Sequence, residues 1–106
     1  RLALAAAYLR LLGCRVDEVR VRLAGVEVDL VVHEGETRVL VEVKVRSRSD
    51  YGAAVYAVDR VKCERLRRAA LALQQRAPGP VRIDVIAVDL EGDELHLRRI
   101  RNAVTG

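Results

Sequence analysis

The sequence predicts an α/β fold in which a mixed β-sheet carries a helix on each side. Apolar residues recur at helical spacing near the N-terminus and again after residue 59. Three alternating segments follow the first helix, and two further strand-like segments follow the second. The predicted order is therefore αβββαββ. A chain of 106 residues, 51% of them hydrophobic, suffices for one domain, residues 1–106, with a single core.

Both helices are predicted from apolar spacing and from residues that begin or end a helix. Gly13 is a natural stop for the first helix. Asp59 is a suitable N-cap for a second helix that runs to about Arg76. The positions expected to face the core are Leu2, Ala5, Ala6, Leu9 and Leu12 in the first helix and Leu66, Ala69, Ala70 and Leu73 in the second.

Strands are predicted at residues 19–23, 81–88 and 94–100, and a hairpin occupies residues 26–46. Residues 81–88 form the most continuously apolar segment, which favours a place inside the sheet. Residues 102–104 are expected to form a short turn.

The hairpin has one apolar face on each strand, because strand side chains alternate between two faces. Gly35-Glu36 suits a two-residue type II′ turn, with glycine at the position that needs a positive φ. The apolar positions, expected to be buried together, are Val26, Val28, Leu30 and Val32 on the first strand and Val39, Val41, Val43 and Val45 on the second.

Four charged residues share the other face of the hairpin in this register. Asp29 is expected opposite Glu42, and Glu27 opposite Lys44. Directly opposed Cβ atoms lie about 4.5–5.5 Å apart, and two carboxylates at such a separation repel unless a cation lies between them. From the residue types alone, a metal site and a solvated ladder of ion pairs across the strands fit equally well.

Lysine usage singles out the same face. Of 19 basic residues, only Lys44 and Lys62 are lysine and the other 17 are arginine. Lysine is a compact charge on a flexible stem, which suits a site that must orient a water molecule beside a phosphate. Chance explains two lysines among nineteen positions as well, although Lys44 follows Glu42 by two residues on the charged face.

Several short motifs follow one another through nearly the whole chain. Asp29 followed by Glu42-Val43-Lys44 resembles the Asp…Glu-x-Lys core of the PD-(D/E)xK nuclease superfamily, with a spacing similar to that of archaeal Holliday-junction resolvases. The further motifs are Ala6-Ala7-Tyr8-Leu9 with Gly13, Glu27-Val28-Asp29-Leu30, Val45-Arg46, Tyr51-Gly52, Val58-Asp59-Arg60-Val61-Lys62, Arg82-Ile83-Asp84-Val85-Ile86 and Asn102-Ala103-Val104. In this order they resemble the motifs of the YraN-type family, bacterial proteins with a restriction-endonuclease-like fold.

The resemblance implies a single nuclease-like domain, a DNA endonuclease whose expected substrate is branched or damaged DNA. Asp29 and Glu42, with the backbone carbonyl of Val43, would hold Mg²⁺ or Mn²⁺, since magnesium prefers oxygen ligands and keeps several waters. The metal would polarise the phosphate and lower the pKa of a water molecule. Lys44 would orient that water or stabilise developing charge, and Glu27 would be an extra ligand or a partner of Lys44.

The basic residues favour a polyanionic partner, and we expect that partner to be DNA. The formal net charge is +4, which favours nucleic acid. The candidate contacts are Arg46, Arg48, Tyr51 and Lys62. For Lys62, a phosphate at the start of the second helix and a surface lysine lying along apolar surface are equal alternatives.

One departure from the family motifs supports a second hypothesis. The family has glutamate on its first helix, six residues before the tyrosine, where this chain has Leu2. In related resolvases that glutamate contributes to the metal site. A non-catalytic domain that binds nucleic acid or a protein partner is therefore the alternative to a nuclease. Resolvase-like relatives act as dimers, and the sequence leaves a homodimer open.

The rest of the sequence argues for a cytoplasmic protein without a membrane partner. No apolar run approaches the roughly 18 residues of a membrane span, and residues 2–12 are expected to form a helix rather than a signal peptide. Cys14 and Cys63 have no metal-type spacing, so reduced thiols are expected and a disulfide remains open. Asp84, on a central strand, is expected to be a structural carboxylate.

Overall fold

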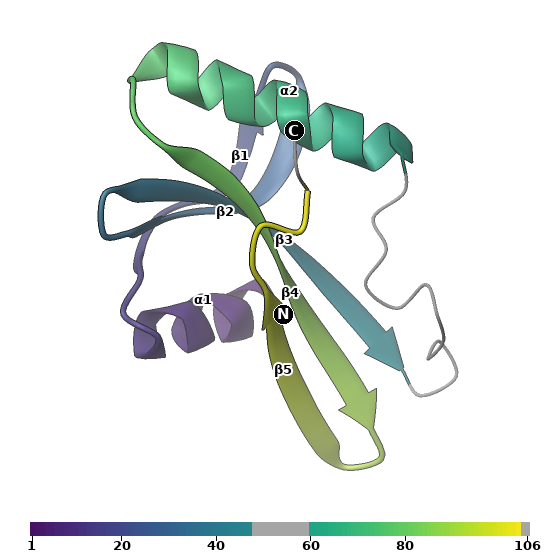
Figure 1. Cartoon of the computed structure of the whole chain (residues 1–106). Coiled ribbons are helices and arrows are strands. Elements are labelled where there is room, and N and C mark those ends of the chain that lie inside the picture. Colours follow the sequence, from purple (N-terminus) through teal and green to yellow (C-terminus); the bar gives the residue numbers. More distant parts are fainter. Residues whose placement is uncertain (48–59, 105–106) are drawn as a thin grey trace.

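A computed structural model describes residues 1–47 and 60–104 and has the predicted element order (Figure 1). The helices are α1 (Leu2–Leu11) and α2 (Arg60–Arg76). The strands are β1 (Arg15–Leu23), β2 (Val26–Glu34), β3 (Thr37–Ser47), β4 (Val81–Glu91) and β5 (Glu94–Ile100). β1 begins four residues before the predicted start and β4 ends three residues after its predicted end. The proposed N-cap Asp59 lies outside the described residues.

The strands form one sheet in chain order, β1-β2-β3-β4-β5. Neighbouring strands are antiparallel except β3 and β4, which are parallel because α2 carries the chain back between them. β4 is buried from Ile83 to Asp89, as its apolar sequence predicts. The α/β architecture is confirmed, and it is compatible with a restriction-endonuclease-like core.

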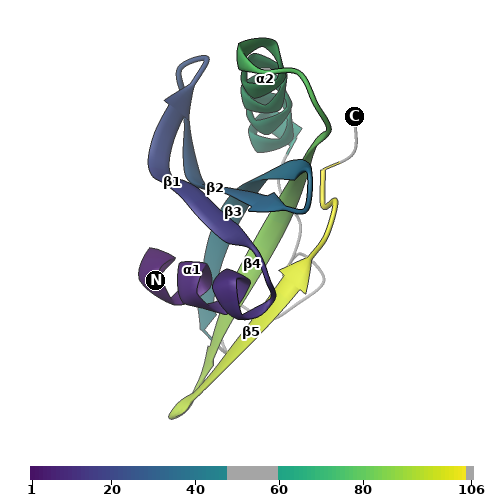
Figure 2. The same cartoon turned by 90° about the vertical axis from the view of Figure 1, so that its left-hand side faces the viewer.

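Each face of the sheet has its own apolar core, so the single core expected from the sequence is divided in two. α1 and α2 cover opposite faces (Figures 1 and 2). The α1-side core contains Ala5, Ala6, Leu9, Cys14, Leu30, Val32, Val39, Val41, Ile86 and Val88. The α2-side core contains Leu23, Val26, Val28, Val31, Leu40, Leu66, Ala69, Leu73, Ile83 and Val104. The sheet is therefore a layer between two helices, and its polar residues must lie at its ends or beside a helix.

Arg38, at the start of β3, fixes the C-terminal end of α2. Its guanidinium donates to the carbonyl of Leu73 at 3.1 Å and to that of Ala77. The last carbonyls of a helix have no partners within the helix, so a basic side chain there both satisfies and orients them. This contact ties α2 to the strand that carries Glu42 and Lys44.

Neither helix among residues 1–47 and 60–104 is long and apolar enough to cross a membrane. Cys14 and Cys63 are thiols rather than a disulfide.

Candidate active site

The turn between β2 and β3 has the predicted form. Glu34 pairs with Thr37, which leaves Gly35 and Glu36 as a two-residue loop, and the register continues to Leu30 opposite Val41. Gly35 has a φ of 59°, the left-handed conformation that the sequence assigned to glycine here. The next position of this register would place Asp29 opposite Glu42.

β2 bends at Asp29, and this bend was not predicted. Val28 packs in the α2-side core whereas Leu30, two residues later, packs in the α1-side core. Pairing with β1 passes from Val19–Leu30 directly to Val21–Val28, and the intervening Arg20 has a φ of 51°. The expectation that the alternating apolar residues of the hairpin are buried together on one face is therefore wrong, because the face reverses at Asp29.

The bend brings Asp29 against β3. The backbone N–H of Val43 donates to Oδ2 of Asp29 at 2.7 Å, beyond the last residue pair of the β2–β3 ladder. The carboxyl of Asp29 also lies within hydrogen-bonding reach of Glu42, which is 9% exposed. Burial raises the pKa of Glu42, and the nearby charge of Asp29 raises it further. The prediction that Asp29 and Glu42 lie close together therefore agrees with the structure.

Lys62 of α2 completes this group from the side. Its Nζ lies 3.3 Å from Oε2 of Glu42, and its charge opposes the increase in the pKa of Glu42. The sequence suggested a phosphate contact or a surface lysine for Lys62 and did not pair it with Glu42. The available signal was its rarity, since Lys62 is one of two lysines in the chain.

Lys44 lies two residues after Glu42 on β3, so the two side chains project from the same side of the strand. It is partly exposed and stands in register with Ala87 of β4. Asp29, Glu42, Lys44 and Lys62 are therefore supplied by two adjacent strands and the first turns of α2.

Glu27 is not brought into this group. It was expected opposite Lys44, but the paired part of the β2–β3 hairpin extends from Glu34–Thr37 only to Leu30–Val41. Glu27 is exposed and stands opposite Arg22 of β1. Within the part of the chain that the structure describes, no three His, Cys, Asp or Glu side chains form a metal-binding group. Glu27 therefore does not form a group of three carboxylates with Asp29 and Glu42 in this structure.

The remaining candidates lie farther along β3 or beyond it. Val43 is a candidate for its backbone carbonyl, and its side chain packs against the α1-side core. Arg46 is partly buried, in register with the buried Asp89 of β4 and on the same side of β3 as Lys44. Arg48 and Tyr51 lie outside the described residues.

Leu2 occupies the first turn of α1 and lines a cavity with Val19 and Arg20. Arg20 is the residue at which β1 bends, and it lies level with Asp29 in the register of β1 and β2. The position at which the resembled family has glutamate therefore lies near the strand bend that presents Asp29.

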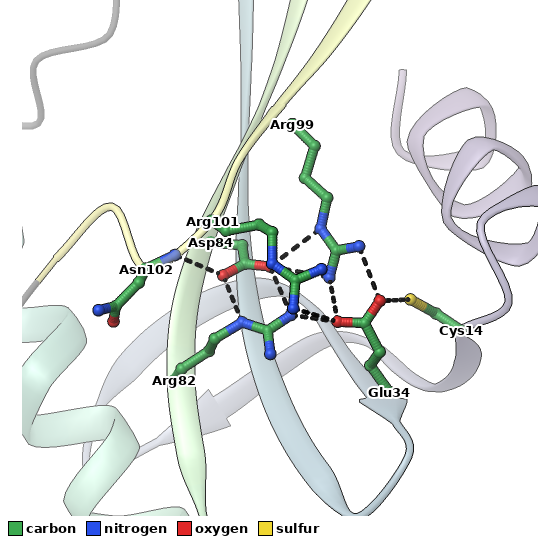
Figure 3. Close-up of polar contacts among 7 residues, drawn as sticks. All are labelled: Cys14, Glu34, Arg82, Asp84, Arg99, Arg101 and Asn102. Carbon is green, nitrogen blue, oxygen red and sulfur yellow. Dashed lines mark hydrogen bonds and ion pairs between the residues drawn. The ribbon is translucent and has the colours of Figure 1, made fainter.

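A second charged group, which we call the ionic cluster, lies on the α1 side of the sheet and was not predicted as a group. Figure 3 shows Glu34 and Asp84 surrounded by the guanidinium groups of Arg82, Arg99 and Arg101. Arg99 binds Glu34 through two bonds of 2.9 Å and Asp84 at 3.1 Å.

Asp84 is completely buried and takes further bonds from Nε of Arg82 at 2.9 Å and the backbone N–H of Asn102 at 2.8 Å. The structural role expected for Asp84 is thus correct. Every acidic oxygen of the cluster is held by arginine or backbone groups, which leaves the Asp29–Glu42 pair as the better candidate for a cation.

The donor set at Asp29 and Glu42 fits a hard divalent cation. It offers carboxylate oxygens that lie close together, one of them buried, and a neighbouring ammonium group already compensates part of their charge. Histidine and cysteine, the ligands typical of zinc sites, are absent from the group described here. The arrangement can hold a magnesium-sized ion through two protein carboxylates.

Comparison with known proteins gives consistent matches. The sequence profile of a family described as "Uncharacterised protein family UPF0102" matches residues 3–88. The "UPF0102 protein MCA0184" of Methylococcus capsulatus is 43% identical over 101 residues, covering 93% of this chain and 82% of its own length. UPF0102 proteins of Halorhodospira halophila and Solibacter usitatus are 44% and 45% identical, covering 87% and 83% of this chain and 74% and 70% of their own lengths.

Proposed function

This chain belongs to the UPF0102 family, which is the YraN family, and from that premise we propose that it is a magnesium-dependent endonuclease acting on DNA. The observation that carries the proposal is the contact between Asp29 and Glu42 beside Lys44 and Lys62. A buried glutamate placed against an aspartate is unfavourable for folding even with Lys62 beside it, because burial and the neighbouring charge of Asp29 both disfavour the ionised form of Glu42.

Each residue has a task that follows from its place. Asp29 and Glu42 would hold the cation, and the Val43 amide fixes the carboxyl of Asp29 before any ligand arrives. Magnesium, when bound, supplies a Lewis acid for a phosphoryl group. Lys44 extends from the same side of β3 and would orient a water molecule or stabilise negative charge that develops on the phosphate.

Metal binding is the first test. Calorimetry with Mg²⁺ and Mn²⁺ should show one site on the wild-type protein, and Asp29→Asn or Glu42→Gln should weaken it about tenfold or more. Asp93→Asn removes an exposed carboxylate in the turn between β4 and β5 and serves as the control. Equal binding by all four proteins would refute the assignment.

One observation favours a second function, a nucleic-acid-binding domain without catalysis. Leu2 stands where the resemblance to the family motifs leads us to expect glutamate, and its cavity contains Arg20 and Val19 but no carboxylate among the residues described. Cleavage of supercoiled and branched DNA, tested on wild type and on Leu2→Glu, separates the two. Cleavage by either protein supports the nuclease, and binding without cleavage by both supports the alternative.

A further inference from the structure

A basic groove lies beside the acidic pair, between α2 and the turn that joins β1 to β2. Its volume is about 400 Å³, and it is lined by Gly25, Val26, Glu27, Lys62, Arg65 and Arg68. Lys62 belongs both to this groove and to the acidic pair, because its Nζ lies 3.3 Å from Glu42. The groove therefore opens directly next to the candidate active site.

The three cations of the basic groove follow one another along α2. Residues three apart are neighbours on a helix surface, and each step advances about 4.5 Å along the axis. Lys62 is nearest to Glu42, and Arg65 and Arg68, both exposed, lead away from it. Glu27 supplies one carboxylate on the opposite wall, so cations outnumber anions in the groove three to one.

Arg67 and Arg76 of α2 lie outside the basic groove. Arg67 lines a different cavity, of about 420 Å³, with Leu71, Gln74 and residues of β4 and the C-terminal turn. Arg76, at the far end of α2, lies 3.9 Å from Glu18. The cations of α2 are thus not equivalent, because Lys62, Arg65 and Arg68 share a groove that Arg67 and Arg76 do not line.

We propose that the basic groove binds the sugar-phosphate backbone of one DNA strand and directs that strand past Lys62 to the acidic pair. This inference rests on the proposed function, because it names the path by which the substrate of that site would enter. Arg65 and Arg68 would each contact a phosphate, and such contacts position a strand without reading its sequence. A groove of about 400 Å³ is comparable to a small-ligand pocket, which suits one strand rather than a duplex.

The test measures binding of a fluorescein-labelled single-stranded 20-mer by anisotropy, in EDTA, over a series of salt concentrations. Arg65→Gln/Arg68→Gln should lose affinity about tenfold or more, and the slope of log K against log salt should fall by about 1.4 for two lost phosphate contacts. Arg67→Gln/Arg76→Gln removes the same charge from α2 outside the basic groove. It should change affinity less than about threefold and leave the slope nearly unchanged.

A variant expected to bind DNA more tightly is a useful complement, because misfolding would lower affinity and could not mimic a gain. Glu27→Gln removes the carboxylate from the groove wall and should raise affinity about threefold in the same assay, since it relieves repulsion of phosphate. Thermal unfolding followed by circular dichroism checks that each variant folds.

The possible results distinguish failure of the groove proposal from failure of the endonuclease proposal. If the two double variants lost affinity for the 20-mer equally, or if Glu27→Gln gained none, the proposal that the basic groove binds a DNA strand would be wrong. This holds whether or not the protein cleaves DNA. Groove-dependent binding by a protein that cleaves no substrate would leave the binding site standing and refute the proposed endonuclease.

Discussion

Lys44 follows Glu42 by two residues on β3, whereas Lys62 reaches Glu42 from α2, and of these two lysines it is Lys62 that forms an ion pair with Glu42. An ammonium group that compensates Glu42 could in principle be replaced by a guanidinium group. A lysine that orients a water molecule could not, because the broad planar fork of arginine has a different shape. Substitution by arginine should therefore be tolerated at Lys62 if it only compensates the charge of Glu42, and should not be tolerated at Lys44 if it orients a water molecule.

We expect Lys44→Arg to abolish DNA cleavage while fold and DNA binding remain nearly intact. The substitution keeps the charge, so an electrostatic or structural role would survive it, whereas precise positioning beside a phosphate would not. Cleavage of supercoiled and branched DNA with magnesium or manganese is the measurement, and Arg76→Lys, at the far end of α2, is the control substitution. Cleavage by Lys44→Arg at the wild-type rate would disprove this role.

In the ionic cluster, Glu34 has a pKa of about 2, against an ordinary value of 4.5, chiefly because Arg99 and then Arg82 donate hydrogen bonds to it. A carboxyl whose pKa is lower in the folded state favours folding when it is charged in both states. Its contribution is therefore complete above about pH 4.5 and is lost as the pH falls towards about 2.

Glu34→Gln should lower the free energy of unfolding by on the order of 2 kcal/mol at pH 7. The difference from wild type should shrink between pH 4.5 and pH 2, where wild-type Glu34 also becomes neutral. Urea unfolding at several pH values measures this. Glu94→Gln, at an exposed carboxylate of β5, should have little effect at any pH. A difference that does not depend on pH would contradict the assignment.

At the scale of elements, the bend of β2 controls the site. It separates Val28 from Leu30, allows Asp29 to reach the Val43 amide, and directs Glu27 away from Lys44. The alternation of apolar and polar residues gave no sign of it, because both faces of the sheet are buried and valine suits either one. Arg20, whose φ is 51°, is the residue of β1 that accommodates the same bend.

Arg20→Val should destabilise the protein and weaken metal binding. A β-branched residue is strongly disfavoured in the left-handed region, so the strand must strain or straighten. We expect Arg20→Val to be about 1–2 kcal/mol less stable than Arg20→Gly, which tolerates this conformation. Chemical denaturation and calorimetry with Mn²⁺ measure the two effects. Equal stability of the two variants would show that the bend does not depend on this backbone conformation.

At the scale of the whole molecule, most of the fold could be predicted and part of the site could not. Spacing and turn residues predicted the element order, the Gly35 turn and the approach of Asp29 to Glu42. These features depend on residues that are close in sequence or on the pairing register of one hairpin. Lys62 and Arg99 depend on packing between elements far apart in the chain, which no local pattern encodes.

The two charged groups lie on opposite faces of one sheet and differ in how their charges are satisfied. The ionic cluster holds its carboxylates among three arginines, whereas among the described residues the acidic pair has an ion pair with Lys62 and a hydrogen bond from the Val43 amide. The first arrangement is suited to joining β2, β4 and β5. The second places two carboxylates against each other, and the proposed metal site rests on this arrangement.

The ion pair between Lys62 and Glu42 also bears on whether the protein needs a metal ion in order to fold. The acidic pair already has a cation beside it, so a divalent ion that bound there would replace the Lys62 ammonium as the partner of Glu42 rather than neutralise carboxylates that have no cation near them. The protein can therefore fold and persist without metal, and a chelator should not denature it. If a divalent ion displaced the ammonium group from Glu42, Lys62 would still line the basic groove, so the proposed metal binding and the proposed strand binding would involve the same lysine.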